Sequence, residues 1–370
     1  MTAWRRPLSS CLAALVLCGG CGGSPDSAAG PRSVLDELPV GWSELPPPPE
    51  VRSRGATVWT GEDLLVWGGY VFDGSGDKPE QANGYVFEGR AESWDELAAT
   101  PLSPRAYAAA AWTGEELLIW GGTDGRQERF FDDGAAYDPE TDSWRVLPEA
   151  PIRAQAPLSV WTGRELIVWG TAVRIRDRPR DGAAYDPRAN TWRTIPEAPI
   201  ELTDATAVWT GRELIVFGAA LHGGNFPETR TAIGAAYDPE RNTWRRLPDS
   251  TLSPQASTAA WTGTELVAWD YGNSTGAYDP RTNDWRELPD VPLDAGECAP
   301  NSIPVRTLVL GDYCGGLVVY DPSMDRWRDI SRPELRGWGF ELVRADPVAF
   351  LLGRNAETGE ERMLAYRPPT

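Results

Sequence analysis

The sequence is almost devoid of histidine and lysine. His222 is the only histidine and Lys78 the only lysine among the 370 residues. A single imidazole leaves no set of histidine ligands for a zinc site, and no Ser-His-Asp arrangement is recognisable around it. His222 lies in the segment LHGGNFPETR, where we expect an exposed loop residue that is a candidate ligand contact.

Positive charge is also scarce. Lysine and arginine together number 35 against 54 aspartates and glutamates, so the net charge is −19. A surface of this sign repels both nucleic acid and anionic lipid. We therefore expect no nucleic-acid partner, and contact with a membrane only through an attached lipid.

Long hydrophobic runs are missing as well. The apolar stretch LSSCLAALVLC at residues 8–18 follows Arg5 and Arg6 and is too short to cross a bilayer as a helix. A positive start followed by a short apolar run is typical of a secretory signal. We expect an extracytoplasmic protein.

The segment CGGC at residues 18–21 resembles the lipobox of bacterial lipoproteins, in which a cysteine after small residues receives lipid. This resemblance implies lipidation of Cys21 and anchoring to the cell membrane; cleavage after Ala29, giving a secreted protein, is the alternative. The predicted organisation is a signal peptide, a flexible linker and one folded domain, at residues 1–20, 21–37 and 38–370.

Only five cysteines are present, and Cys11 and Cys18 would leave with the signal. If Cys21 carries lipid, Cys298 and Cys314 remain as an even pair. In an exported protein such a pair predicts a disulfide.

What the sequence has in abundance is an internal repeat. The tripeptide WTG occurs at residues 59–61, 112–114, 161–163, 209–211 and 261–263, at spacings of 48 to 53 residues. An apolar run such as ELLIWGG follows each copy, then a variable loop, then GAAYDP or GAYDP. Six residues after that Asp, a Trp begins an ending such as WRVLP.

Each repeat predicts four short strands. In the second repeat these are AYAAAAW, ELLIW, GAAYD and WRVLP, separated by glycine and proline turns. The alanine-rich first strand suits a crowded position near a central axis, and the aliphatic second strand suits burial on both faces. One four-stranded sheet per repeat of about 50 residues is a propeller blade.

Seven endings of the Trp-x-x-Leu/Ile type predict seven blades. The seventh unit, at about 333–368, offers only three strands, whereas GWSELP at 41–46 is an ending with no unit before it. We predict an all-β, seven-bladed propeller whose N-terminal strand completes the C-terminal blade, because this closure removes an exposed sheet edge.

The repeat resembles the kelch family, in which an aliphatic strand ends in Gly-Gly and a Tyr and a Trp follow at fixed separation. Gly68-Gly69 and Gly121-Gly122 match the first feature, and Tyr137 with Trp144 matches the second. A WD-repeat propeller is disfavoured because the Gly-His and Trp-Asp marks do not recur. Copper chemistry of the galactose oxidase type, known on kelch propellers, needs two histidines and is disfavoured by one; we expect no cofactor and no metal.

Function in a propeller is expected at the end with variable loops, because loops on a rigid scaffold tend to carry binding residues. The segment RIRDRPRD places four arginines at alternate positions, where they would share one side of an extended chain. Two further arginines stand near the starts of innermost strands. The ligand-binding candidates, besides His222, are Arg174, Arg176, Arg178, Arg180, Arg105 and Arg153.

Two functional hypotheses follow. The first is a monomeric binding protein of the cell envelope that recognises a protein or a glycan without turnover. The second, implied by the kelch resemblance, is a carbohydrate-active enzyme similar to the sialic acid mutarotases, with Glu, Asp and Arg at the channel mouth for acid–base chemistry. Convergence of loop acids and arginines in a pocket would favour the enzyme, and scattered charges on a flat rim would favour binding.

Overall fold

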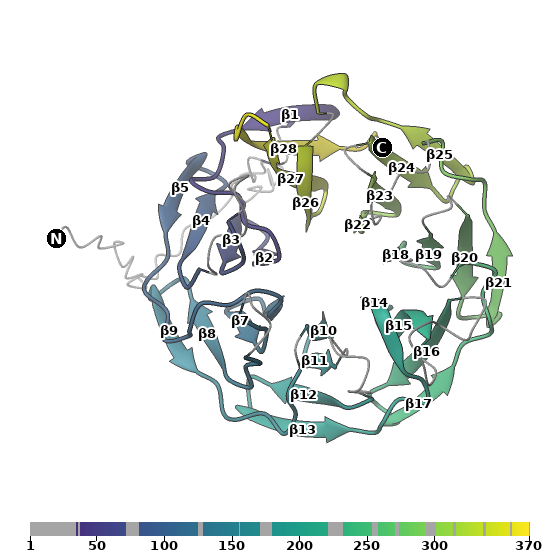
Figure 1. Ribbon diagram of the computed structural model, residues 1–370, viewed down its shortest axis with the longest axis horizontal. Helices are drawn as coiled ribbons and strands as arrows, with labels where there is room; N and C mark the ends of the chain where they lie inside the picture. The colour runs from purple at the N-terminus through teal and green to yellow at the C-terminus, as the bar shows by residue number, and fades with distance from the viewer. Residues whose placement is uncertain are drawn as a thin grey trace, which may run out of the picture. The chain divides into compact units, whose positions relative to one another are not determined.

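The computed structural model describes Leu35 and residues 38–71, 81–124, 129–154, 156–170, 180–220, 232–253, 258–270, 274–293, 301–313, 316–335, 338–355 and 357–369. These residues form seven antiparallel four-stranded sheets arranged in a ring, with the first strand of each blade at the centre and the last at the rim (Figure 1). The predicted all-β, seven-bladed propeller is confirmed.

The strands follow the repeat in chain order. The first three blades are β2(Ala56–Trp59) β3(Asp63–Trp67) β4(Gly84–Glu88) β5(Ser93–Glu96), β6(Ala109–Trp112) β7(Leu117–Trp120) β8(Gly134–Asp138) β9(Ser143–Val146), and β10(Leu158–Trp161) β11(Leu166–Trp169) β12(Gly182–Asp186) β13(Thr191–Ile195). The next three are β14(Leu202–Trp209) β15(Leu214–Ala220) β16(Ile233–Asp238) β17(Thr243–Arg246), β18(Thr258–Trp261) β19(Leu266–Trp269) β20(Thr275–Asp279) β21(Asp284–Glu287), and β22(Asn301–Val305) β23(Leu308–Tyr313) β24(Gly316–Asp321) β25(Arg326–Asp329). A 3-10 turn, η1(Pro333–Leu335), precedes the seventh blade, which holds β26(Trp338–Ala345) β27(Val348–Asn355) β28(Glu361–Arg367) and β1(Gly41–Leu45).

The ring closes through the two ends of the propeller chain. β1 pairs antiparallel with β28, from Gly41 opposite Arg367 to Leu45 opposite Met363. The strand predicted from GWSELP therefore completes the last blade, as expected. Leu35 lies within the predicted linker, yet it is buried in the core cluster shared by blades 7 and 1.

Burial follows the sequence pattern of each strand. All four residues of β7, and likewise of β11 and β19, are buried, because second strands are covered on both faces by neighbouring blades. The WTG turn holds its shape by side-chain chemistry: the Thr113 hydroxyl accepts hydrogen bonds from the backbone N–H groups of Glu115 and Glu116. Gly114 between them has φ +102°, a conformation that favours glycine.

The tryptophans join adjacent blades. The indole of Trp192 on β13 donates to the Pro148 carbonyl of the preceding blade at 3.0 Å and lies 5.3 Å from the ring of the buried Trp120. Trp144 repeats this arrangement with Ala98 and Trp67. These repeated tryptophans pack blades together.

A second inter-blade contact recurs at the rim, through four arginines that we call the latch arginines. Each binds a glutamate of its own blade through two guanidinium nitrogens and donates to a tyrosine hydroxyl of the next blade. For Arg193 the distances are 3.1 and 2.7 Å to Glu165 and 3.2 Å to Tyr237. The latch arginines are Arg145, Arg193, Arg245 and Arg286, which span the junctions from blade 2 to blade 6.

Within the described ranges, no helix is both long and apolar enough to cross a membrane. The predicted signal peptide, the lipidation of Cys21 and the disulfide between Cys298 and Cys314 all concern residues outside the described part of the chain.

Candidate functional site

Two buried arginines hold the start of blades 1 and 2 in place. Arg105 is fully buried; its guanidinium donates to the Gly121 carbonyl at 3.1 Å and to both carboxylate oxygens of Asp133 at 2.8 and 3.2 Å. Arg52 occupies the same position in blade 1 and donates to the Gly68 carbonyl and to the Asn83 side chain. Burying a guanidinium is costly unless its donors are satisfied. Apart from Nε of Arg52, these donors have partners, and the contacts fix the chain just before β2 and β6.

Two residues beyond each buried arginine, the backbone adopts an unusual conformation. Arg54 and Tyr107 both have φ +58°, in the left-handed region that bulky side chains rarely adopt. The hydrogen bond from the Tyr107 N–H to the Arg54 carbonyl, at 2.9 Å, ties the two positions together. Strain of this kind persists only where the surroundings impose it, and it clusters at functional sites.

The side chains of these strained residues meet those of a third. The Arg54 guanidinium lies over the Tyr107 ring, 5.5 Å from its centroid, and the Tyr70 ring meets the Tyr107 ring edge-on at 6.0 Å. Arg54 is exposed, and both tyrosines are partly exposed. The arrangement therefore offers aromatic surface and a cationic donor to the solvent.

The fourth member is Glu341 on β26, the innermost strand of blade 7. Its carboxylate lies near Arg54. Burial raises the pKa of Glu341 to about 7, although the charge and the backbone N–H of Arg54 oppose that rise. Blades 7, 1 and 2 thus supply Glu341, Arg54 with Tyr70, and Tyr107 to one place, which we call the central cluster.

The central cluster lies at the end of the ring where innermost strands begin and where second strands run into variable loops. An acid with a pKa near neutrality exchanges protons readily at physiological pH, an arginine binds anionic or polar oxygens, and tyrosine rings cover apolar faces. Together these groups suit a polar ligand with apolar faces, such as a sugar. No group of three or more metal-ligating side chains occurs among the residues that the structure describes.

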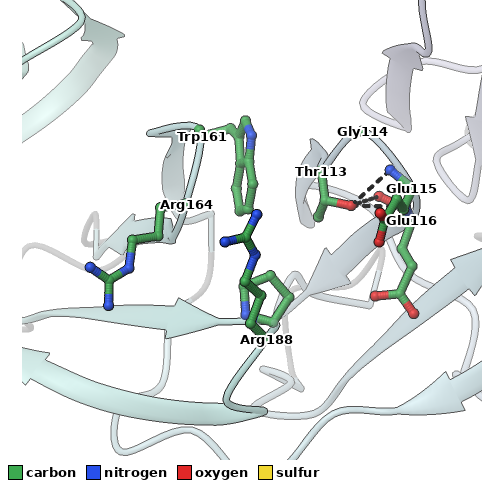
Figure 2. A pocket seen from close by; sticks show the side chains of 9 residues that line it. Thr113, Gly114, Glu115, Glu116, Trp161, Arg164 and Arg188 are labelled. Carbon is green, nitrogen blue, oxygen red and sulfur yellow. Dashed lines mark hydrogen bonds between the residues drawn. The ribbon is translucent and has the colours of Figure 1, made fainter.

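A hollow lies at the opposite end, between the WTG turns of blades 2 and 3 (Figure 2). Its volume is about 260 Å³, and its walls are Thr113, Gly114, Glu115, Glu116, Trp161, Gly163, Arg164, Pro187 and Arg188. Trp161 and Arg188 stand on one wall and face Thr113, Glu115 and Glu116 on the other. We call this feature the turn hollow.

The described arginines predicted from sequence lie in different settings. Arg105 is fully buried with its donors bound within the protein, so it presents no exposed donor to a ligand, contrary to the role expected for it. Arg153 is largely exposed and pairs with Asp132 at 2.7 Å, whereas Arg180 donates to the Ala198 carbonyl at 2.7 Å. The remaining candidates lie outside the described residues: Arg174, Arg176, Arg178 and His222.

Sequence reasoning missed all four members of the central cluster. A signal for two of them was present in the repeat. Counting back from the Trp of WTG, the fifth preceding residue is Arg54 in blade 1 and Tyr107 in blade 2, but Ala156 in blade 3. The seventh preceding residue is Arg52 in blade 1, Arg105 in blade 2 and Ala154 in blade 3. Blades 1 and 2 thus differ from blade 3 at both positions, that of the buried arginine and that of the strained residue.

Comparison with known proteins agrees with this architecture. A family model described as the kelch motif matches residues 104–151, which span blade 2. No curated protein matches the sequence.

Two of the solved structures that share the fold illustrate the likeness. The one titled "Structure of YjhT" is 16% identical with a TM-score of 0.56, and the match covers 78% of this chain and 99% of that one. A fungal alcohol oxidase of the AA5 family, solved in complex with copper, is 12% identical with a TM-score of 0.62; coverage is 90% and 77%. At such identities the likeness establishes the fold. The chain is a seven-bladed β-propeller that carries a kelch motif in its second blade, and a galactose oxidase-like protein is among its structural neighbours.

Proposed function

We propose that the protein is a glycan-binding module of the cell envelope and that the central cluster is its binding site. The observation that carries this proposal is the meeting of Arg54, Tyr70, Tyr107 and Glu341 beside the innermost strands. Two of the four residues keep a strained backbone, which is hard to explain by packing alone.

Sugar chemistry fits these side chains. A pyranose ring has apolar C–H faces and a rim of hydroxyl groups. The tyrosine rings supply an apolar surface, while Arg54 donates and Glu341 accepts hydrogen bonds at its border. A protein ligand remains the alternative for a binding module and would need a wider contact surface.

The test replaces the strained residue by glycine. Tyr107→Gly removes the aromatic ring but adopts φ +58° without strain, so the fold should be retained. We expect glycan binding on an array to fall at least tenfold, with an unfolding free energy that is unchanged or higher by up to about 1 kcal/mol.

A matched control is Tyr85→Phe, which keeps an aromatic ring on β4 outside the central cluster. Unchanged glycan binding by Tyr107→Gly would refute the assignment of the site. Binding of envelope proteins, with no glycan bound, would identify the protein-binding alternative instead.

The raised pKa of Glu341 favours a second candidate, acid–base catalysis on a carbohydrate. A carboxyl group with a pKa of about 7 can take up and release a proton at neutral pH. Turnover by the wild type, such as exchange between sugar anomers followed by NMR, and its loss in Glu341→Gln would support the enzyme. Binding without turnover would support the module.

The envelope location rests on the N-terminal sequence. The apolar run and CGGC at 18–21 support export and a lipid on Cys21. Cys21→Ser should then move the protein from the membrane fraction to the soluble fraction. Equal incorporation of labelled fatty acid by this variant would place the anchor elsewhere or exclude it.

A further inference from the structure

The turn hollow is an asymmetric feature on the regular end of the propeller. One wall comes from blade 3 and combines the partly exposed Trp161 ring with Pro187, Arg164 and Arg188. The other wall comes from the WTG turn of blade 2 and carries Glu115 (Figure 2). Aromatic, apolar and cationic groups therefore face an acidic one across an open space.

The repeat provides internal controls for this arrangement. The residue after WTG is Glu62, Glu115, Arg164, Arg212 and Thr264 in successive blades, and the residue after YDP in blades 2 to 5 is Glu140, Arg188, Glu240 and Arg281. Blade 3 alone among these has arginine at both places. The scaffold is common to the blades, so this charge pattern is not required by the fold.

Arg188 also differs from comparable arginines in its contacts. Arg281 binds its own Asp279 at 2.9 Å, and Arg241 binds its own Asp238. In blade 3 the equivalent Asp186 contacts Arg164 at 3.5 Å, and among the described residues Arg188 makes no ion pair. Its guanidinium is thus exposed and available at the mouth of the hollow.

The carboxylate of Glu115 is available in the same way. Its neighbour Glu116 is held by the latch arginine Arg145, at 2.6 and 2.8 Å, whereas Glu115 is exposed and has no ion pair within the described ranges. Among the described residues that line it, the hollow therefore presents an unpaired cation and an unpaired anion on opposite walls, with Trp161 on the same wall as Arg188.

We propose that the turn hollow is a docking site for an acidic segment of a partner protein. An aspartate or glutamate side chain of that segment enters the hollow and receives two parallel hydrogen bonds from Arg188, with its aliphatic part against Trp161 and Pro187. Glu115 accepts a hydrogen bond from a backbone N–H of the same segment, which sets the direction of docking.

Arg164 and Arg188 favour an acidic occupant of the hollow, and the net charge of the molecule excludes a long anionic one. A nucleic acid, carrying one negative charge per phosphate, is repelled over its length by a protein of net charge −19. A short acidic segment places its charge only at Arg164 and Arg188. Beyond about 8 Å, physiological salt screens the repulsion from the rest of the surface. The hollow is open and holds about 260 Å³, which suits a protruding side chain better than an enclosed small molecule.

The experiment uses the full-length protein and fluorescein-labelled octapeptides with a central Asp or Glu and varied apolar neighbours. Fluorescence anisotropy identifies the tightest peptide, and its Asp or Glu is then replaced by Asn or Gln. We expect Arg188→Ser to weaken binding at least tenfold, and the amide peptide to bind equally weakly to both proteins. Arg281→Ser is the matched control, because it removes an ion-paired arginine from the same turn of blade 5, and it should change affinity less than twofold.

A second variant tests the opposite wall. Glu115→Lys adds a cation to the hollow and should strengthen binding of the acidic peptide several-fold while disturbing no described ion pair. The proposal is overturned if no peptide binds below about 1 mM, or if Arg188→Ser and Arg281→Ser weaken binding equally. Preference for acidic oligosaccharides over every peptide, lost in Arg188→Ser, would replace the protein partner by a glycan.

Discussion

The junction between blades 1 and 2 is fastened differently from the junctions between blades 2 and 6. At the rim, latch arginines join each blade to the next from blade 2 to blade 6. Between blades 1 and 2 this contact is missing, because Asp95 stands where the latch arginine would be. There the blades are joined near the centre by backbone hydrogen bonds, from the Gly69 N–H to the Arg105 carbonyl and from the Tyr107 N–H to the Arg54 carbonyl, both at 2.9 Å. The side chains of Arg52 and Arg105 hold these segments within their own blades.

The pKa values of Tyr137 and Tyr185 are affected differently at these two junctions. Burial raises the pKa of both Tyr137 and Tyr185, but Arg145 opposes the rise only for Tyr185. Tyr137, the equivalent in blade 2, donates to Asp142, and this hydrogen bond raises its pKa further. The rim contact is thus repeated at the junctions from blade 2 to blade 6, and it is absent between blades 1 and 2, where the central cluster is built.

Among the variants that test this contrast, we expect Arg105→Met to change the unfolding free energy most. The change leaves the buried carbonyl of Gly121 and part of Asp133 without a donor, which should lower the unfolding free energy by about 3 kcal/mol. Urea denaturation measures it. Arg153→Met, which removes a largely exposed arginine paired with Asp132, should cost less than about 0.5 kcal/mol. Equal losses for the two variants would show that central fastening contributes little.

Glu341→Gln should change the pH dependence of stability. Because the folded-state pKa of about 7 lies above the unfolded value, the folded protein holds the proton more tightly, and stability falls as pH rises from about 4.5 to 7. The glutamine variant should lack this loss, so its unfolding free energy at pH 7.5 should exceed that of the wild type by roughly 1 to 3 kcal/mol. We expect a value in the lower part of this range because the Glu341 side chain is partly exposed. Denaturation at pH 4 is the control, since the two proteins should differ little below the unfolded-state pKa. Parallel stability curves across this range would contradict the raised pKa.

A smaller effect is expected at the rim. Arg193→Met removes the contact from Glu165 to Tyr237 and should cost about 1 kcal/mol, because the arginine is partly exposed. Arg246→Met, on the exposed side of the neighbouring outer strand β17, should leave the unfolding free energy nearly unchanged. Identical thermal transitions for both variants would show that the latch arginines do not couple blades.

The architecture was largely predictable from sequence because the Trp-x-x-Leu/Ile ending occurs seven times, once for each blade. Strand order, blade number and the pairing of GWSEL with the last blade all follow from spacing and from the incomplete seventh unit. The role of the tryptophans in packing was also predictable, because a residue that recurs at one place in each blade is expected to pack the blades.

The central cluster was not predicted, for physical reasons that its residues illustrate. Arg54, Tyr107 and Glu341 are far apart in sequence and meet only because the ring brings blade 7 beside blade 1. Glu341 lies in a blade without WTG, so the repeat gave no register for it. Its pKa depends on burial, which composition does not reveal. Arg105 was misassigned because a position near an innermost strand does not say whether the side chain turns toward solvent or into the blade.

The pairing of β1 with β28 also sets an order of events in folding. β1 spans Gly41–Leu45 and its partner spans Glu361–Arg367, so roughly three hundred residues must be synthesised between the first strand of this sheet and its other three strands. Each of the other six blades contains all of its strands in one stretch of chain and can form locally. The last blade depends on a contact of very high sequence separation, which is slow to form because the intervening loop must first be closed. Until that moment β28 is an unpaired edge that another chain could occupy, so completion of the ring is the step at which the molecule ceases to be prone to aggregation.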